Sequence, residues 1–387
     1  LALTKSRTLY FFLAGLCFGL GFVIKQHGVV FIIWSGLVVV VDCFLTPTRR
    51  NYKDSLRYGS LFFLGVFVPY ILICLILFKA GVFDTFWFWT FDYAREYTGQ
   101  VSLTQAINAL KRNSLPIIFA SPLVWALAVV GLPLAFLRGR NVGIFVGSFA
   151  IFSFLAICPG GFFRPHYFVL LLPAVALLFG VSVGSLSNLK FCSQSHTLRN
   201  YISFAVIIIA LFSSLYFQRH FLFQLAPAEA SASIYWPNPF NESLEIAQYI
   251  KQDSRPGDQI AVIGSEPQIP FYSGLRSASG YIYMYPLMET HDFALTMQQE
   301  FIEEVSTAQP QYLIFVRIPT SWLQKPGSHQ LIYDWFVKYK ENYERIGMVE
   351  IFEKNSRYSW TPNVLWPPKT PYWVEILKKK PNRNFLI

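Results

Sequence analysis

The sequence predicts a polytopic α-helical membrane domain followed by a C-terminal α/β domain, and three observations lead to this fold class. The 387 residues are 53% hydrophobic and 18% aromatic but only 14% charged, whereas soluble globular domains carry about 25% charged residues. Long apolar runs fill residues 1–217. Over residues 218–387, helical segments alternate with short apolar strands, as in layered α/β domains. The predicted domains are therefore 1–217 and 218–387.

The first apolar stretch, from Leu9 to Leu45, is too long for one membrane span. As a single helix it would measure about 55 Å at 1.5 Å per residue, against a hydrocarbon core about 30 Å thick. The polar residues and glycine at 25–28 (KQHG) permit a reversal, so a helical hairpin is expected. In all, the sequence predicts seven spans: Thr8–Ile24, Val29–Leu45, Gly59–Phe78, Ser114–Leu137, Val142–Cys158, Tyr167–Ser187 and Tyr201–Phe217.

Basic residues in the loops predict how these spans are oriented. One set of loops is rich in Lys and Arg: Arg49, Arg50, Lys53 and Arg57, then Arg138 and Arg140, then Lys190 and Arg199. The short loops of the opposite side carry only Lys25 and Arg164. Positive charge marks the cytoplasmic side of a membrane protein. The predicted location is the cytoplasmic membrane, with the Lys25 turn, the 79–113 loop, Arg164 and residues after Phe217 facing outward.

An aromatic segment at 86–97 (FWFWTFDYAREY) lies in the predicted outer loop. Flat amphipathic rings are favoured at the membrane–water interface, so the segment is interpreted as an interfacial anchor or as one wall of a groove for a lipid chain. The groove interpretation makes Trp89, Tyr93 and Arg95 candidate lining residues. Asp92 and Glu96 form a solvated face or, less simply, include a catalytic base.

The C-terminal region is predicted as a small α/β layer domain with a partly parallel sheet. Asn241 is expected to cap a helix that runs to about Gln252. The runs Gln259–Gly264 and Tyr312–Val316 are predicted as neighbouring strands. Further segments are helices at Asp292–Ser306 and Leu331–Tyr339, a strand at Tyr343–Phe352 that ends the regular pattern, and a basic tail at Lys378–Arg383 that is solvated or contacts anionic lipid.

Several familiar chemistries lack their sequence signals. The chain has no Gly-x-Ser-x-Gly, no His-Glu-x-x-His and no Gly-rich phosphate loop. Its five cysteines lie within or beside apolar runs, so neither a disulfide framework nor a metal site is predicted. The net charge of +10 is spread over loops and forms no block that could track a nucleic acid. No cofactor and no nucleic-acid partner are therefore expected.

A group of basic and aromatic residues on the predicted outer side is the remaining candidate for a functional site. Arg164, His166 and Tyr167 open one span, and Lys25 and His27 lie in the first hairpin turn. Arginine offers a planar fork of donors that matches a phosphate, lysine adds a point charge, and histidine donates a hydrogen bond. These residues are predicted to bind a lipid-linked phosphate, with His27 in the adjoining groove. For Lys25, simple snorkelling to the interface is the alternative.

The sequence also resembles a known family. The residues 12–21 (FLAGLCFGLG) with Lys25 look like the "GlxxGlaxxxK" span of GT-C membrane glycosyltransferases, in particular bacterial relatives of protein O-mannosyltransferases and of the lipid A aminoarabinose transferase. Residues 164–168 (RPHYF) followed by 171–173 (LLP) are similar to a late span of these enzymes. Residues 263–269 (IGSEPQI) and 272–276 (YSGLR) look like the outer cap of one branch.

The resemblance implies transfer of a sugar from a polyprenyl-phosphate donor to a lipid, glycan or protein acceptor at the outer membrane face, with inversion at the anomeric carbon. In the family, an acidic residue of the first outer loop is the base. That segment is missing here, so the chain is expected to be N-terminally truncated and its catalytic residues remain unknown. Arg164, assisted by Lys25 and His166, is expected to stabilise the departing phosphate.

Two other classes of function stay open. A non-enzymatic transporter or flippase for lipid or glycolipid would also suit apolar spans, an aromatic outer loop and basic residues at the membrane surface. A sensor or scaffold whose C-terminal domain binds a partner is the third. The residues upstream of Leu1 discriminate between them, because an Asp-Asp or Asp-Glu pair after a first span favours the transferase and a further symmetrical set of spans favours the transporter.

Overall fold

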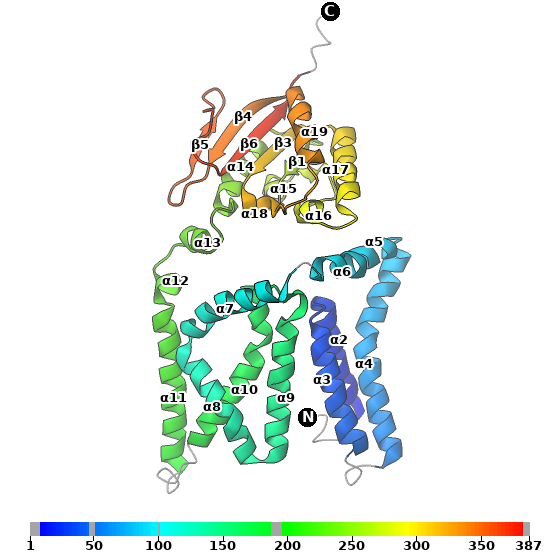
Figure 1. Ribbon diagram of the computed structural model, residues 1–387, viewed down its shortest axis with the longest axis vertical. Coiled ribbons are helices and arrows are strands. Elements are labelled where there is room, and N and C mark those ends of the chain that lie inside the picture. The colour runs from blue at the N-terminus through cyan, green and yellow to red at the C-terminus, as the bar shows by residue number, and fades with distance from the viewer. Residues whose placement is uncertain (1–7, 46–50, 100, 187–195, 382–387) are drawn as a thin grey trace, which may run out of the picture. The chain divides into compact units, whose positions relative to one another are not determined.

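The computed structural model describes residues 8–45, 51–99, 101–186 and 196–381. The chain divides into two compact units, Leu1–Leu222 and Phe223–Ile387. The first unit is helical, and the second contains a β-sheet with helices (Figure 1). This agrees with the predicted succession of an apolar helical region and an α/β region.

Over its described residues, the first unit is made of helices. In chain order they are α2 (Thr8–Ile24), α3 (Gly28–Val40) with the π-helix η1 (Val41–Leu45), α4 (Tyr52–Lys79), α5 (Phe83–Trp87), the π-helix η2 (Phe88–Asp92), α6 (Tyr93–Thr98), α7 (Leu103–Ala120), α8 (Pro122–Arg138), α9 (Arg140–Ile157), the 3-10 helices η3 (Pro159–Gly161) and η4 (Pro165–Leu170), α10 (Leu172–Leu186), α11 (His196–Phe217) and α12 (Arg219–Phe223).

Several of these helices have the length and composition of membrane spans. Within the described residues, Tyr52–Lys79, Arg140–Ile157 and Thr197–Phe217 are long and apolar enough to cross a membrane, and the bent pair α7 and α8 makes a fourth if it counts as one span. Thr8–Ile24, Gly28–Cys43 and Leu172–Ser185 are shorter apolar helices. Large apolar side chains such as Phe67, Ile76 and Ile151 are exposed on them. These helices indicate a multi-pass membrane protein.

The prediction of one continuous span over Ser114–Leu137 is wrong. The chain breaks at Ser121, and α7 and α8 are bent by 104° relative to each other. The cause is local, because Pro122 disfavours a helical conformation at the preceding residue, and Ser121 has φ −147° and ψ 58°. As a result α7 begins at Leu103, well before the predicted span, and carries polar residues along one side.

The predicted span Tyr167–Ser187 also starts too early. Residues Pro165–Leu170 form the 3-10 helix η4, and the α-helix α10 begins only at Leu172. Pro173 suits the first turn of α10, where its missing N–H has no intrahelical partner to lose. The residue Ser187 lies outside the described residues. Arg164 and its neighbours therefore sit on a short, tightly wound segment rather than in a regular helix.

Helices α2 and α4 run side by side (Figure 1) and touch backbone to backbone. A Cβ atom at Gly15 would stand 2.0 Å from the Phe62 carbonyl oxygen, and one at Gly65 would stand 2.3 Å from the Phe12 carbonyl oxygen. Gly19, four residues after Gly15, is equally crowded. Such spaced small residues let membrane helices approach closely. This contact anchors α2, whose end carries Lys25.

The second unit contains a mixed sheet. Its elements are α13 (Pro227–Tyr235), α14 (Phe240–Asp253), β1 (Gln259–Ile263), α15 (Gln268–Ser273), β2 (Arg276–Ser277), α16 (Tyr285–Met288), α17 (Ala294–Ala308), β3 (Tyr312–Arg317), α18 (Pro319–Trp322), α19 (Leu331–Tyr339), the 3-10 helix η6 (Lys340–Asn342), β4 (Tyr343–Glu350), β5 (Arg357–Trp360) and β6 (Trp373–Lys379). The described strands lie in the order β2-β1-β3-β6-β4-β5. β1 is parallel to both β2 and β3, and the pairs involving β6, β4 and β5 are antiparallel.

The predicted pairing of the two apolar strands is confirmed, with Ile260 opposite Tyr312 in parallel register. Helices cover both faces of the sheet. On one face Ile314 of β3 packs in a core with Ile246 of α14. On the other, the Phe315 ring stacks on Phe336 of α19 at 4.3 Å. β3 is thus buried on both faces, which explains its continuous apolar sequence.

Two expectations for this unit are wrong. Asn241 is not the cap of α14, because the helix starts at Phe240 after Pro239, and the Asn241 side chain instead donates to the Ala228 carbonyl oxygen at 2.9 Å. Regular structure does not end near Phe352 either. β6 runs to Lys379, pairs with both β3 and β4, and places Lys378 against Asp253 at 2.6 Å. The basic stretch is therefore sheet up to Lys379, and residues 382 and 383 lie outside the described residues.

Candidate functional site

The first part of the site is the tight turn between α2 and α3, which carries Lys25 and His27. The backbone N–H of Gly28 donates to the Lys25 carbonyl oxygen at 2.8 Å and closes the turn. A Cβ atom at Gly28 would stand 2.7 Å from the Gly21 carbonyl oxygen, so a larger residue does not fit without a shift of the backbone. The turn therefore holds Lys25 and His27 in fixed positions at the adjoining ends of two helices.

The second part is the segment that follows α9 and leads to Arg164. Its backbone is left-handed at Gly160 (φ 73°), Gly161 (φ 67°) and Phe163 (φ 42°). For a residue other than glycine this conformation costs about 1–3 kcal/mol and persists only where the surroundings enforce it. Phe163 is buried in an apolar cluster, and the Asn113 side chain of α7 donates to its carbonyl oxygen at 2.9 Å. The packing of α7 thus fixes the backbone position from which the Arg164 side chain extends.

The two parts meet around the ring of Tyr167. The Lys25 ammonium nitrogen lies 4.0 Å from the centre of this ring. The His27 ring lies 4.9 Å from it and the His166 ring 4.7 Å, both edge to face. Nδ1 of His27 is 2.7 Å from the Ala156 carbonyl oxygen at the end of α9. We call Lys25, His27, Arg164, His166 and Tyr167 the basic lip. Its residues come from the first hairpin turn and from the segment after α9, which are far apart in sequence but form one cluster.

Like charges influence one another within the basic lip. Burial and, after it, the nearby charge of Arg164 lower the pKa of Lys25 below its ordinary value. Burial, then Lys25 and Arg164, lower the pKa of His166. Burial also lowers the pKa of His27, helped by Lys25 and His166 and opposed by the hydrogen bond to Ala156. Both histidines are therefore harder to protonate than an ordinary histidine, and a bound anion would raise their pKa values.

The aromatic outer segment adjoins the same turn. The Gln26 side-chain amide donates to the Thr90 carbonyl oxygen of η2 at 2.6 Å. The rings of Trp89 and Tyr93 lie 5.2 Å apart, and α6 is in contact with η3 just before the basic lip. Arg95 is exposed on α6. Of the candidate groove residues, Trp89 and Tyr93 therefore lie on elements linked to the basic lip.

Sequence reasoning missed two residues that position the site. Gln26 fastens the outer segment to the turn, and Asn113 fixes the backbone before Arg164. In the sequence, Asn113 is a polar residue at the edge of an apolar run, and this position alone predicts the end of a loop. Gln26 follows Lys25, and the sequence predicts only that both belong to the polar break between two helices. Neither contact follows from spacing, because each partner lies at least fifty positions away.

No metal centre accompanies the basic lip. Over the described ranges, His, Cys, Asp and Glu side chains do not gather in threes in a way that could hold a metal ion. The basic lip offers nitrogen donors with cationic or protonatable character, which suit an anion such as a phosphate.

Comparison with known proteins adds no assignment. No family model matches the chain, and no curated protein matches it. The function proposed for the basic lip consequently rests on its own chemistry and on the resemblance of the motifs.

Proposed function

We propose that this protein transfers a sugar from a polyprenyl-phosphate donor to an acceptor at the outer face of the cytoplasmic membrane, as a relative of the GT-C glycosyltransferases. The observation that carries the proposal is the basic lip: Lys25 and two histidines lie around the Tyr167 ring at the ends of apolar helices, and Arg164 is close enough for its charge to act on Lys25 and His166. Gathering like charges works against folding unless a ligand of opposite charge uses them, so such groups mark functional sites.

Arg164, Lys25 and His166 of the basic lip each have a defined part in this reaction. As the bond between the anomeric carbon and the phosphate oxygen breaks, negative charge grows on the departing polyprenyl phosphate. Arg164 meets two phosphate oxygens with its planar fork, and Lys25 adds a positive charge held over the Tyr167 ring at 4.0 Å. His166 donates a hydrogen bond, more strongly once protonated. Donors fixed before the reaction stabilise this charge without reorganisation.

The outer segment supplies a path for the lipid part of the donor. The rings of Trp89 and Tyr93 offer an amphipathic surface beside the turn that Gln26 fastens to Thr90. A prenyl chain lying there keeps its phosphate at the basic lip. The acceptor and the catalytic base are left open in this proposal.

The experiment replaces Arg164. Arg164→Ala should slow sugar transfer roughly ten- to a hundredfold, because the lost contact strengthens as charge develops on the phosphate. Arg164→Lys should recover only part of the rate, since a point charge does not reproduce the fork. Transfer from a polyprenyl-phosphate sugar is measured with the full-length protein in membranes, with expression level equalised. Arg57→Ala, which removes an exposed arginine from α4, is the matched control.

Full activity in Arg164→Ala would contradict the proposal and leave the basic lip as an interfacial anchor. Movement of a labelled glycolipid across vesicles by the protein, with no transfer product, would instead support a transporter.

A further inference from the structure

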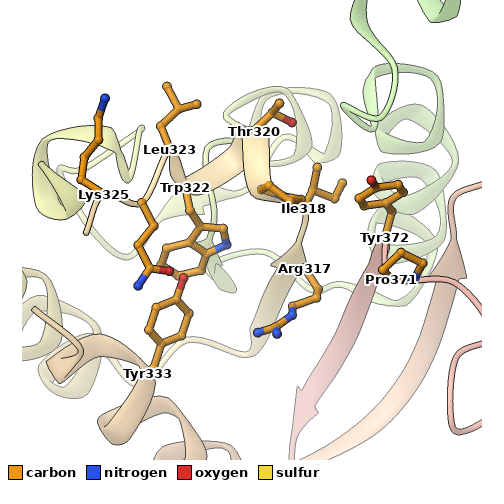
Figure 2. A pocket seen from close by; sticks show the side chains of 11 residues that line it. Arg317, Ile318, Thr320, Trp322, Leu323, Lys325, Tyr333, Pro371 and Tyr372 are labelled. Atoms are coloured by element: carbon orange, nitrogen blue, oxygen red, sulfur yellow. The ribbon is translucent and has the colours of Figure 1, made fainter. Parts of the chain in front are cut away.

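The second unit holds a cavity at the carboxyl end of β3, which we call the β3 cavity. It has a volume of about 620 Å³, within the usual range of about 300–1,000 Å³ for small-molecule sites. Figure 2 shows Trp322 and Tyr333 on one side, Pro371 and Tyr372 on the other, and Arg317 between them. Most of its wall is the segment 317–325, which follows β3 directly.

The topology of the sheet places the β3 cavity at the edge where the parallel strands β1 and β3 end. β1 lies between β2 and β3 and is parallel to both. The chain therefore leaves β1 toward one side to reach β2, and then returns across β1 to reach β3. In open α/β sheets, ligands bind at the carboxyl ends of parallel strands near such a reversal. The β3 cavity lies at the carboxyl end of β3 on the side of β6: Arg317 pairs with Trp373, and Pro371 and Tyr372, just before β6, form the opposite wall.

The wall of the β3 cavity is held in place by buried hydrogen bonds. The Ser321 hydroxyl donates to a carboxyl oxygen of Glu266 at 2.9 Å, and the same hydroxyl oxygen accepts a hydrogen bond from the Ser265 backbone N–H at 2.8 Å. These bonds tie the loop after β1 to α18. The indole N–H of Trp322 donates to the Val316 carbonyl oxygen at 2.7 Å, which fixes the ring. The wall is thus pre-formed, which lowers the entropic cost of binding.

One wall residue has a strained backbone. Leu323 has φ 48°, although it carries a side chain and is 37% exposed. Non-glycine residues in this conformation cluster at functional sites. In addition, Thr320, which lines the cavity, has a buried hydroxyl oxygen with no hydrogen-bond partner among the described residues.

The charge of the β3 cavity selects the sign of its ligand. The residues that line it include the cations Arg317 and Lys325 and no carboxylate. Burial raises the pKa of Tyr333 to about 12, against the opposing charge of Arg317, so its hydroxyl stays neutral and donates a hydrogen bond. Three aromatic side chains, Trp322, Tyr333 and Tyr372, complete the wall. Flat apolar rings beside hydroxyls and cations suit a ring-shaped, hydroxylated, negatively charged ligand.

We infer that the β3 cavity binds an anionic saccharide, a sugar ring that carries a carboxylate or a phosphate, with Arg317 on the charged group and Trp322 and Tyr333 along the ring. Its preference for an anion stands on the lining residues alone. The choice of a saccharide over other ring-shaped anions rests on the proposed function, in which this unit accompanies a sugar-transfer site and would hold the acceptor glycan.

The test measures saccharide binding to the whole chain in detergent by calorimetry and saturation-transfer NMR. Cellobiouronic acid is compared with cellobiose, which lacks only the carboxylate, and glucose 1-phosphate is compared with glucose. Each charged member should bind at least tenfold more tightly than its neutral counterpart. The two pairs distinguish a carboxylate from a phosphate as the preferred group. Inorganic phosphate and adenosine monophosphate serve as further probes.

Variants locate the binding. Arg317→Gln should weaken binding of the preferred charged saccharide about tenfold or more, which is about 1.4 kcal/mol, and Tyr333→Phe should weaken it less. Arg255→Gln, which removes an exposed arginine of the same unit, should leave binding unchanged. Near-native thermal unfolding of each variant establishes that it is folded, and Tyr333→Phe provides a second variant if Arg317→Gln is not.

Three results would overturn the inference: equal binding of charged and neutral saccharides, charged-saccharide binding that Arg317→Gln does not change, or tighter binding of adenosine monophosphate than of any saccharide. Arg164→Ala separates the two proposals. It should abolish most transfer and leave saccharide binding at the β3 cavity intact. Loss of saccharide binding in Arg164→Ala would assign the binding to the basic lip instead.

Discussion

The two units of this protein differ in how their charged side chains are paired. In the second unit, buried carboxylates are matched with arginines: Glu375 and Glu350 are each 1% exposed and accept hydrogen bonds at 2.6 Å from Arg345 and Arg357. In the first unit, the basic lip brings Lys25, Arg164 and two histidines close enough to lower pKa values. Each buried carboxylate of these pairs has its charge compensated, because an unpaired buried charge is costly, whereas a cluster of like charges is a candidate site for a ligand of opposite charge.

Glu266 is a further buried carboxyl of the second unit whose side-chain hydrogen-bond donor is the neutral Ser321 hydroxyl, and it gives the largest expected effect. Burial raises its pKa to about 8, so the folded protein keeps a proton that the unfolded chain releases near pH 4.5. A raised carboxyl pKa stabilises the fold at low pH, and this stability is lost as pH rises from about 4.5 to 8. The loss amounts to about 1.4 kcal/mol per pH unit at most, on the order of 4 kcal/mol in total.

Glu266→Gln keeps the shape and the acceptor for Ser321 but removes the titration. The variant should therefore be more stable than the wild type at pH 8.5 and should lose the fall in stability between pH 5 and pH 8. Urea unfolding read by proteolysis within residues 223–381, at pH 5 to 9, measures this. Glu303→Gln, at an exposed position on α17, is the control. Identical pH profiles for wild type and Glu266→Gln would show that the buried carboxyl is charged throughout and matched like the others.

Breaking a matched pair should have the next largest effect. Arg345→Met leaves the carboxylate of Glu375 buried without its partner and should lower the free energy of unfolding by about 3 kcal/mol. Arg345→Met with Glu375→Leu should recover most of this, because an apolar pair of similar size needs no charge compensation. The same urea assay measures both, with Lys354→Met as the exposed control. A double variant as unstable as the single one would mean that shape, not charge matching, holds β4 to β6.

Local sequence signals predicted the elements whose causes are local. The helix at Leu331–Tyr339 has the predicted bounds, and the strands β1 and β3 were recognised as short apolar runs between turns. The bend at Ser121 was missed because the long apolar run outweighed the effect of Pro122 on the residue before it. β6 was missed because Lys378 and Lys379 suggested a tail, while its buried residues Val374 and Ile376 gain their place only from distant strands.

The basic lip was predictable in its membership but not in its geometry. Residue type and membrane topology pointed to Lys25, His27, Arg164 and His166, yet nothing local indicates that Tyr167 lies at their centre. The glycine-rich run at 12–21, one carrier of the family resemblance, has a packing role of its own in the α2–α4 contact. That part of the resemblance is therefore also explained by helix packing, and the basic lip carries more of the functional argument.

The smallest expected effect concerns proton uptake at the basic lip. The pKa values of His166 and His27 are lowered in the free protein, and a bound phosphate would raise them. Binding therefore takes up protons, and affinity should increase as pH falls from 8 to 6. The increase should stay below about tenfold, or about 1.4 kcal/mol, because burial opposes protonation of both histidines.

A phosphodiester donor analogue suits the measurement, because its single negative charge does not titrate between pH 6 and 8 and any pH dependence belongs to the protein. His166→Gln should flatten the dependence, since it removes one of the two groups that gain a proton. Lys25→Gln should raise the pKa of His166 in the free protein by removing a nearby positive charge, and should thereby shift the dependence to higher pH. His220→Gln, at an exposed histidine of α12, should change nothing. An affinity that increases with pH, or a slope that is unchanged in His166→Gln, would mean that the bound phosphate does not reach His166.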